Sequence, residues 1–261
     1  MSDTDARTAT EAGDVTTATA TEAGGATRPS PPSRPTRRRV LTVSTAIAAT
    51  SVLWAPTPAS AAPAAAPAAG AEGGRRATTW PGRVSANGWP VLASAPAHRV
   101  QGAGALTVRL AEGDAATVLL HVLRRYCYEI DMLAQHDVAG HTTDRAVRAD
   151  LESNRLSGTA LTIREVAYPL GAPAGNGMGA EQITVIEDIL AECQGVVAWG
   201  GETSPLKQSH FQIDVPPGDA RLRKLVARIN GWSEHPGQGA GATDAFEPGR
   251  ISRARKARNA R

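Results

Sequence analysis

The sequence predicts an α+β domain, because segments with helical patterning are separated by short segments with strand patterning. Apolar residues recur every three or four positions in residues 114–130 and 180–194, as they do on the buried face of a helix. Apolar and polar residues alternate in residues 106–110, at the end of a predicted strand over 100–110, and in residues 210–215, as they do in a half-buried strand. The chain has 261 residues, and its patterned part, residues 80–232, has the length of one domain.

The first 61 residues have the composition of an export signal preceded by a disordered segment. Residues 1–35 are rich in Thr, Ala, Ser and Pro and have no apolar periodicity, so we expect them to be disordered. Residues 36–61 contain a basic stretch, a short apolar stretch and Ala-Ser-Ala, which are the parts of a cleaved secretory signal. The arginines at 37–39 resemble a twin-arginine signal, so we expect export by that pathway and a mature chain from about Ala62.

A membrane anchor is the alternative interpretation of this apolar stretch. A spanning helix needs about 20 apolar residues, whereas residues 40–54 form a shorter stretch that contains several Thr and Ser. We therefore expect a secreted or wall-associated protein with no stable membrane anchor after cleavage. Residues 62–79 are rich in Ala, Pro and Gly and are expected to form a flexible linker.

The first half of the domain is expected to contain a turn, a strand and a helix. Asn-Gly at 87–88 is a turn signal, and the strand over 100–110 follows it. Asp114 is expected to cap the helix over 114–130, because its side chain can accept from the first backbone N–H groups. We expect His121, inside this helix, to be a partly buried histidine with satisfied hydrogen bonds rather than a metal ligand.

Residues 132–152 are polar and are expected to form a loop. Asp131, His136 and His141 could suggest a metal site in this region. Their spacings of five and five residues match neither one helical face nor a compact metal-binding loop, so the sequence does not favour it.

The second half of the domain has a regular order of expected elements. They are a strand over 156–163, a loop over 165–179, a helix over 180–194, a strand over 196–199, a strand over 210–215 and a helix over 219–229. Gly195 is suited to end the first of these helices, and Asp219 is suited to cap the second. His210 and Gln212 are two residues apart in a strand, so they should lie on one face.

Residues 233–261 are expected to form a disordered basic tail. Between 250 and 261 the chain has six Lys or Arg residues and no acid. Outside the cell such a tail could lie against anionic wall polymers. Without residues 1–61 the formal net charge is only about +2, and export also argues against nucleic acid as a partner.

The two cysteines, Cys127 and Cys193, leave two possibilities open. An even number of cysteines in an exported protein raises the chance of a disulfide. Both residues are expected near the C-terminal ends of helices, so a disulfide requires that these helices pack together suitably. The alternative is two buried thiols, a common environment for cysteine.

Two segments of the second half resemble the signature segments of a peptidase family. Residues 153–162 read S-N-R-L-S-G-T-A-L-T, and residues 199–212 read W-G-G-E-T-S-P-L-K-Q-S-H-F-Q. They resemble S-x-H-x-x-G-x-A-x-D, and W-G-G followed by D-x-x-H-F-E, of the zinc D-alanyl-D-alanine carboxypeptidase and L-alanyl-D-glutamate endopeptidase family, which cuts peptidoglycan stem peptides. The resemblance covers roughly residues 85–229. It implies a Hedgehog/DD-peptidase-like fold, with a small antiparallel sheet and flanking helices.

The residues that carry the chemistry of that family are exchanged in this chain. Arg155 stands at the position of a zinc-binding His and Thr162 at that of a zinc-binding Asp, so His210 is the only remaining ligand. Lys207 stands at the position of the catalytic carboxylate, and Gln212 replaces the Glu that follows His-Phe. Catalytic zinc takes about three protein ligands, and two cations at the site would repel a dication. We therefore expect that the zinc is lost and that no cofactor replaces it.

These exchanges favour a binding module over a peptidase. We expect an exported, catalytically inactive domain whose cationic groove binds peptidoglycan stem peptides or a related wall carboxylate, since arginine pairs well with carboxylates. Arg145 and Arg148 resemble basic residues that precede the first signature in endopeptidase members, where such an arginine helps to hold the substrate. The alternative is that both are solvated charges of a loop. The expected groove residues are Arg145, Arg148, Ser153, Arg155, Ser157, Thr162, Lys207, His210 and Gln212.

Two alternative functions remain. The first is an active peptidoglycan carboxypeptidase or endopeptidase with a rebuilt site, in which His210 acts as general base with Ser153 or Ser157 as its partner. Nothing in the sequence supplies the third group that orients such a base. The second alternative is a structural wall protein with an inert groove.

Overall fold

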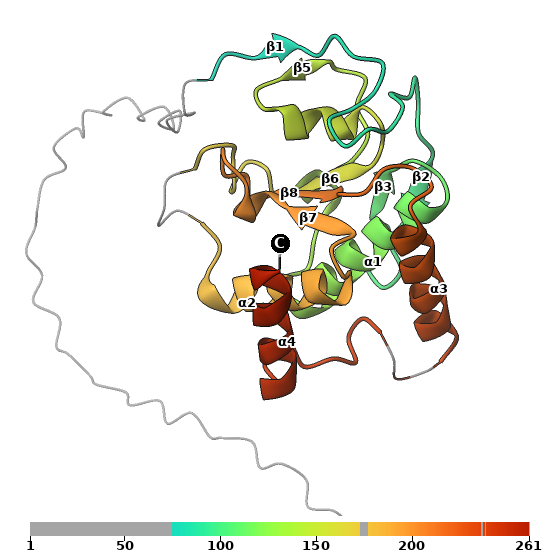
Figure 1. The fold of residues 1–261 in the computed structure, drawn as a ribbon, viewed down its shortest axis with the longest axis vertical. Coiled ribbons are helices and arrows are strands. Elements are labelled where there is room, and N and C mark those ends of the chain that lie inside the picture. Colours follow the sequence, from blue (N-terminus) through green and yellow to red (C-terminus); the bar gives the residue numbers. More distant parts are fainter. Residues whose placement is uncertain (1–74, 173–176, 236, 238, 261) are drawn as a thin grey trace, which may run out of the picture. The chain divides into compact units, whose positions relative to one another are not determined.

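The computed structural model describes residues 75–172, 177–235, 237 and 239–260, and Figure 1 shows the arrangement of their helices and strands. The predicted disordered segment, the predicted signal and most of the predicted linker lie in residues 1–74, outside the described residues. Within the described part, helices pack beside small antiparallel sheets, which confirms the prediction of an α+β fold. None of the helices described there is both long enough and apolar enough to span a membrane.

The largest described sheet has four short antiparallel strands. In order across the sheet they are β4 (Val138–Ala139), β6 (Ala160–Ile163), β8 (His210–Ile213) and β7 (Val197–Trp199). In the central pair, Thr162 on β6 lies directly opposite His210 on β8. This register brings the two motif segments together at one end of the pair.

Two smaller strand pairs lie outside this sheet. They are β1 (Thr78–Thr79) with β5 (Ala146–Val147), and β2 (Ala97–Arg99) with β3 (Thr107–Arg109). Because β1 pairs with β5, the domain includes residue 78, and the predicted linker over 62–79 extends too far. Trp80 continues this attachment, since its backbone N–H donates to the Arg145 carbonyl at 2.8 Å.

The α-helices pack on one another, and the first two along the chain contact the sheet. In the described residues the α-helices are α1 (Asp114–Glu129), α2 (Ala180–Glu192), α3 (Ala220–Glu234) and α4 (Pro248–Asn259), and the 3₁₀ helices are η1 (Gln135–Asp137), η2 (Asp150–Arg155) and η3 (Gly200–Glu202). Helix α1 contacts α2, α3 and β8, whereas α4 packs against α2.

The core lies between α1, α2 and the four-stranded sheet. Phe211 on β8 is fully buried between two other aromatic residues. Its ring centroid is 6.4 Å from that of Trp199 in a stacked arrangement and 6.4 Å from that of Tyr126 in an edge arrangement. Aromatic pairs of this kind contribute about 0.5–1.5 kcal/mol beyond the area that they bury. They join α1 to the sheet that carries the second motif segment.

The predicted helices are present with shifted ends. Helix α1 covers the predicted range, but its N-cap is Gly113, and Asp114 is its first residue and makes no capping hydrogen bond. Asp219 does cap α3, because its carboxylate accepts from the Arg221 N–H at 2.7 Å. This helix continues to Glu234, beyond the predicted end at 229.

The prediction of a loop over 132–152 was wrong. This segment contains η1, β4 and β5, and η2 begins in it. β4 and β5 are each two residues long, which is too short to produce a recognisable alternation of apolar and polar residues. The predicted strand over 156–163 is also shorter, since β6 begins only at Ala160.

The prediction of a disordered tail over 233–261 was wrong as well. Residues 233–234 complete α3, and α4 packs on α2 with Ala254 buried between them. Arg250 binds two carboxylates of α2, at 2.6 Å to Asp188 and 3.2 Å to Glu192. Helix α4 therefore docks mainly through charge, which a search for apolar periodicity does not detect.

The cysteines are present as thiols and form no disulfide in the structure. Cys127 is half-buried in α1, and Cys193 is buried at the end of α2. Of the two possibilities that the sequence left open, the structure has two thiols, of which only Cys193 is fully buried.

Two motif glycines occupy positions where a side chain would not fit. Gly158 has a positive φ of 67°, and a Cβ there would lie 2.6 Å from the Ala111 nitrogen. A Cβ on Gly200 would lie 2.2 Å from the Lys207 carbonyl oxygen, which is closer than van der Waals contact allows. Close backbone packing therefore explains both glycines without reference to catalysis.

Candidate functional site

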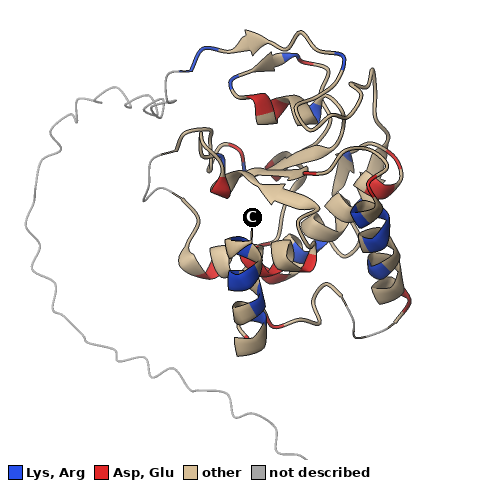
Figure 2. Ribbon diagram, in the orientation of Figure 1, with Lys and Arg blue, Asp and Glu red and all other residues tan. Residues whose placement is uncertain are grey.

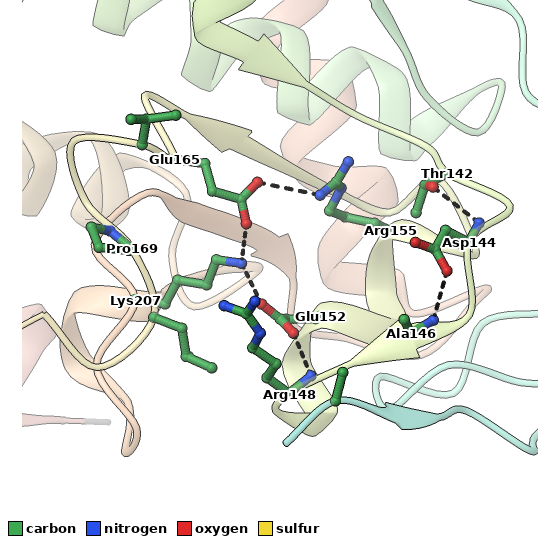
Figure 3. Close-up of a pocket in the computed structure, with 12 residues that line it drawn as sticks. Thr142, Asp144, Ala146, Arg148, Glu152, Arg155, Glu165, Pro169 and Lys207 are labelled. Carbon is green, nitrogen blue, oxygen red and sulfur yellow. Dashed lines mark hydrogen bonds and ion pairs between the residues drawn. The ribbon is translucent and has the colours of Figure 1, made fainter. Parts of the chain in front are cut away.

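The two motif segments meet at a pocket of about 570 Å³ that Figure 3 shows in close-up. The segment around β5, helix η2, the loop after β6 and the turn before β8 form its walls. The charged residues that line it are Asp144, Arg148, Glu152, Arg155, Glu165 and Lys207. Three are basic and three are acidic, so the predicted groove is not purely cationic in the described residues.

Lys207 is held in the wall of this pocket by two carboxylates. Its Nζ lies 2.5 Å from Glu152 Oε1 on η2 and 2.5 Å from Glu165 Oε1 on the loop after β6. Only 1% of the Lys207 side chain is exposed. A buried ammonium needs such partners, because an unpaired charge in this position would cost several kcal/mol.

The two carboxylates are ionised because of the same contacts. Burial by itself would raise the pKa of Glu152 and of Glu165. The Lys207 ammonium overcomes this effect and holds both pKa values below their ordinary value. Lys207 and its partners thus form a charged cluster that is stable at neutral pH.

Arg155 projects into the pocket from the end of η2. Its Nε donates to the Gly140 carbonyl at 2.8 Å, and its Nη1 lies 3.4 Å from Glu165 Oε2. The other terminal amine, Nη2, has no hydrogen-bond partner among the described residues. About 20% of the side chain is exposed, so part of the guanidinium is accessible from the pocket.

Glu165 links three of the four positions at which the motif chemistry is exchanged. Its carboxylate contacts Arg155 and Lys207 and accepts a hydrogen bond from Thr162 Oγ1 at 3.1 Å. The motif positions therefore do lie close together, as their alignment predicts. Sequence reasoning missed Glu165, Glu152 and Asp144, because a single acid gives no signal in the sequence until its partner is known.

The hydrogen bonds around His210 fix the position of its proton. Gln212 donates through Nε2 to the Asp214 carboxylate at 3.1 Å, so Gln212 Oε1 is directed to His210 as an acceptor. His210 Nε2 must therefore be the donor in their 3.0 Å contact. His210 Nδ1 carries the lone pair and is buried with no partner among the described residues. The prediction that His210 and Gln212 share one face of a strand is confirmed.

His210 is a weak base in this environment. Burial, and then the nearby Lys207 ammonium, lower the pKa of His210 to about 4. The ring is therefore neutral at pH 7, and its affinity for a proton is well below that of an ordinary histidine. A general base works best when its pKa is near the working pH.

The predicted groove hydroxyls have a structural role. Ser153 and Ser157 are buried, at 0% and 1% exposure, and bind the turn that contains the Asn-Gly signal. Ser153 Oγ accepts from the Ala86 N–H at 2.9 Å, and Ser85 Oγ donates to Ser157 Oγ at 2.9 Å. Placing these two serines in the groove was wrong, because the segment from residue 85 onward covers them.

Of the two arginines that precede the first motif, one lines the pocket. Arg148 lies in its wall, and its backbone N–H donates to Glu152 at 2.7 Å. Arg145 turns away from the pocket and donates to the carbonyls of Trp80 and Gly82. The prediction that Arg145 belongs to the groove was therefore wrong, since Arg145 fixes the start of the domain on β5.

The alternative metal site at Asp131, His136 and His141 is not assembled. Asp131 pairs with Arg164 at 2.5 Å, and His141 Nε2 is 3.1 Å from the Leu92 carbonyl. The side chain of His136 is 85% exposed. In the part of the chain that the structure describes, no three His, Cys, Asp or Glu residues are grouped as metal ligands.

The residues at the motif positions do not fit zinc. The hydroxyl of Thr162 donates to Glu165, and the two cations Arg155 and Lys207 lie close enough to lower the pKa of His210. One neutral imidazole beside two cations is not a ligand set for a dication.

Comparison with protein families, with curated proteins and with solved structures found no match for this chain.

Proposed function

We propose that this chain is an exported binding domain that holds the carboxylate end of a short peptide, of the peptidoglycan stem-peptide kind, without cutting it. The observation that carries the proposal is the arrangement of Arg155. Its Nε is anchored on the Gly140 carbonyl, while its outer face lines the pocket. An anchored guanidinium can pair with a carboxylate through two parallel hydrogen bonds at a small cost in side-chain entropy.

The charges of the pocket indicate which charged groups its ligand would carry. Glu165 already approaches Arg155 at 3.4 Å, which is longer than its 2.5 Å contact with Lys207. A ligand carboxylate would therefore compete with Glu165 at Arg155 and leave the Lys207 cluster in place. The acids of the pocket suit an amine on the same ligand, so a peptide with both groups fits better than a simple anion.

The same residues argue against hydrolysis. His210 is the only histidine at the motif positions, and its pKa of about 4 makes it a poor general base at neutral pH. The serines that could act with it are bound to the turn at residues 85–87. The rebuilt enzyme therefore has no nucleophile and base in contact. An inert wall protein remains the second alternative, and binding distinguishes the two.

The test is a calorimetric titration of the full-length chain with a synthetic peptide that ends in D-Ala-D-Ala. We expect saturable binding, and weaker binding of the same peptide with an amidated C-terminus. Arg155→Ala should weaken binding by about 1.5–3 kcal/mol, or roughly 10- to 150-fold, because it removes hydrogen bonds to a charged group. Arg221→Ala is the matched control, since Arg221 is exposed and pairs only with Asp219 in the described structure.

Three results would contradict the proposal. Equal affinity of Arg155→Ala and the parent would exclude Arg155 as the binding group. A parent protein that binds neither peptide would favour the inert wall protein. Release of D-alanine by the parent in the presence of a chelator, and its loss in His210→Gln, would favour the rebuilt enzyme.

A further inference from the structure

A second cavity, of about 190 Å³, lies between α1, α3 and the end of β2, away from the pocket described above. Its volume corresponds to roughly six water molecules at about 30 Å³ each. The polar residues that shape it include Arg99, Gln101, His121, Arg124, Asn230 and Ser233. Figure 1 shows that α3 lies beside α1, and residues of both helices line the cavity.

The charge of this cavity has one sign. Arg99 and Arg124 line it, and no Asp or Glu is among its described lining residues. The pocket around Lys207 differs, because its basic residues are matched by an equal number of acids. A cavity lined by arginines without a carboxylate attracts an anion.

Two residues of the lining, Arg124 and His121, each have a buried side-chain nitrogen, Nε and Nδ1 respectively, that lacks a hydrogen-bond partner among the described residues. Buried polar atoms are nearly always paired, and an unpaired one costs about 1–3 kcal/mol. The rest of Arg124 is held in place, since its Nη1 donates to Gln101 Oε1 at 2.9 Å. The hydrogen bond to Gln101 therefore fixes the orientation of the guanidinium, while its Nε–H has no acceptor among the described residues.

His121 is likewise fixed with one nitrogen unused. Its Nε2 contacts Glu192 Oε2 at 3.2 Å, and its ring lies 5.4 Å from that of Trp232 on α3. Since the carboxylate can only accept, Nε2 is the donor. Nδ1 then carries the lone pair and can accept from a ligand hydroxyl. Only 2% of His121 is exposed, so bulk solvent does not supply the missing hydrogen-bond partner of Nδ1.

We propose that this cavity binds a small phosphate group through Arg124, His121 and Arg99. A phosphate has several acceptor oxygens for the two arginines, and at neutral pH part of it also carries a hydroxyl that can donate to His121 Nδ1. A phosphate group fits into a cavity of about 190 Å³ and leaves room for a substituent. Inorganic phosphate and the phosphate of a monoester share this chemistry.

The test titrates inorganic phosphate into the full-length chain by calorimetry at constant ionic strength. We expect one saturable site with a dissociation constant of about 1 mM or lower. Arg124→Met keeps the length of the side chain and removes the unused N–H, so it should weaken binding about tenfold. Arg221→Met removes one positive charge from the exposed surface of α3 and should leave the affinity unchanged.

A second variant tests the histidine. His121→Phe keeps a ring against Trp232 and removes Nδ1, so it should also weaken phosphate binding about tenfold. Thermal unfolding checks that this variant is folded, and if it is not, Arg124→Met alone decides. Glycerol 1-phosphate in place of inorganic phosphate tells whether the site accepts a monoester, and binding of either ligand supports the proposal.

Two results would overturn the proposal. If neither phosphate ligand binds in a saturable way, the cavity holds only water. If Arg221→Met weakens binding as much as Arg124→Met does, the anion responds to the overall charge and not to this cavity. Because the lining residues are remote from the Lys207 pocket, these results are independent of the peptide titrations.

Discussion

At the scale of single residues, Glu165 determines what the pocket can do. Its carboxylate neutralises part of the charge of Lys207 and Arg155, and without it the two cations would repel each other and any metal. The backbone at Arg164 aims this carboxylate, because Arg164 adopts a positive φ of 52° that non-glycine residues rarely adopt. Arg164 is held there by Asp131 and by a backbone hydrogen bond to Asp137.

His210 leads to a prediction about pH at the same scale. The unfolded chain binds a proton at His210 below about pH 6.5, whereas the folded chain does so only below a pKa of about 4. The unfolded state therefore binds more protons in this window, and stability falls as the pH falls. We expect the free energy of unfolding to drop by about 2 kcal/mol between about pH 7 and about pH 5, as measured by urea denaturation.

The matched variants isolate this effect. His210→Gln cannot titrate, so its unfolding free energy should change much less over the same range. His136→Gln removes an exposed histidine and should retain the slope of the parent. Glu152 and Glu165 have lowered pKa values, so their contribution is lost only at lower pH, below about 4.5. An identical slope in His210→Gln and the parent would show that His210 is not buried in its neutral form.

At the scale of elements, the contact between α2 and α4 is the least expected feature. Figure 2 shows Lys and Arg residues along α4, and the acids that α4 meets belong to α2. Behind them, Arg125 of α1 is 0% exposed and lies 2.9 Å from both Asp188 and Glu192. A buried arginine of this kind holds α1, α2 and α4 in one arrangement, because breaking any pair leaves an uncompensated charge.

Arg250 is predicted to be the residue on which the docking of α4 depends. Arg250→Ala should lower the free energy of unfolding by about 1–3 kcal/mol and increase amide hydrogen exchange in α4, because Asp188 loses a charged partner. Arg253→Ala removes an exposed arginine from the same helix and should change stability by less than about 0.5 kcal/mol. If both variants keep the exchange rates of the parent, α4 is held by apolar contacts around Ala254 instead.

At the scale of the whole molecule, the prediction concerns export. The arginines at 37–39 lie outside the described residues, so their role remains a sequence-based prediction. Replacement of all three with lysine should leave the precursor inside the cell, because the twin-arginine pathway distinguishes guanidinium groups from amines. Immunoblots of cell and culture fractions would measure this. Normal secretion of the lysine variant would indicate the general secretory pathway.

The sequence by itself determined those parts of the molecule in which burial is periodic. Helices α1 and α2 follow the apolar pattern, since one face of each must leave water. Strand β8 buries its apolar residues Phe211 and Ile213 as the pattern predicts, although His210 on its other face is buried too. The two motif segments also predicted the proximity of Thr162 and His210, which β6 and β8 place opposite each other. Local pattern is enough for these features because it records which side of an element is buried.

Only the tertiary structure decided the chemistry of the pocket and the course of the C-terminal segment. The two acids that bind Lys207 precede it by 55 and 42 residues, so no local pattern links them to it. Arg250 meets Asp188 across 62 residues for the same reason. Ion pairs need only proximity in space, and they leave no period in the sequence. The sequence therefore shows which residues are charged, but only the tertiary structure shows which of these charges pair with each other.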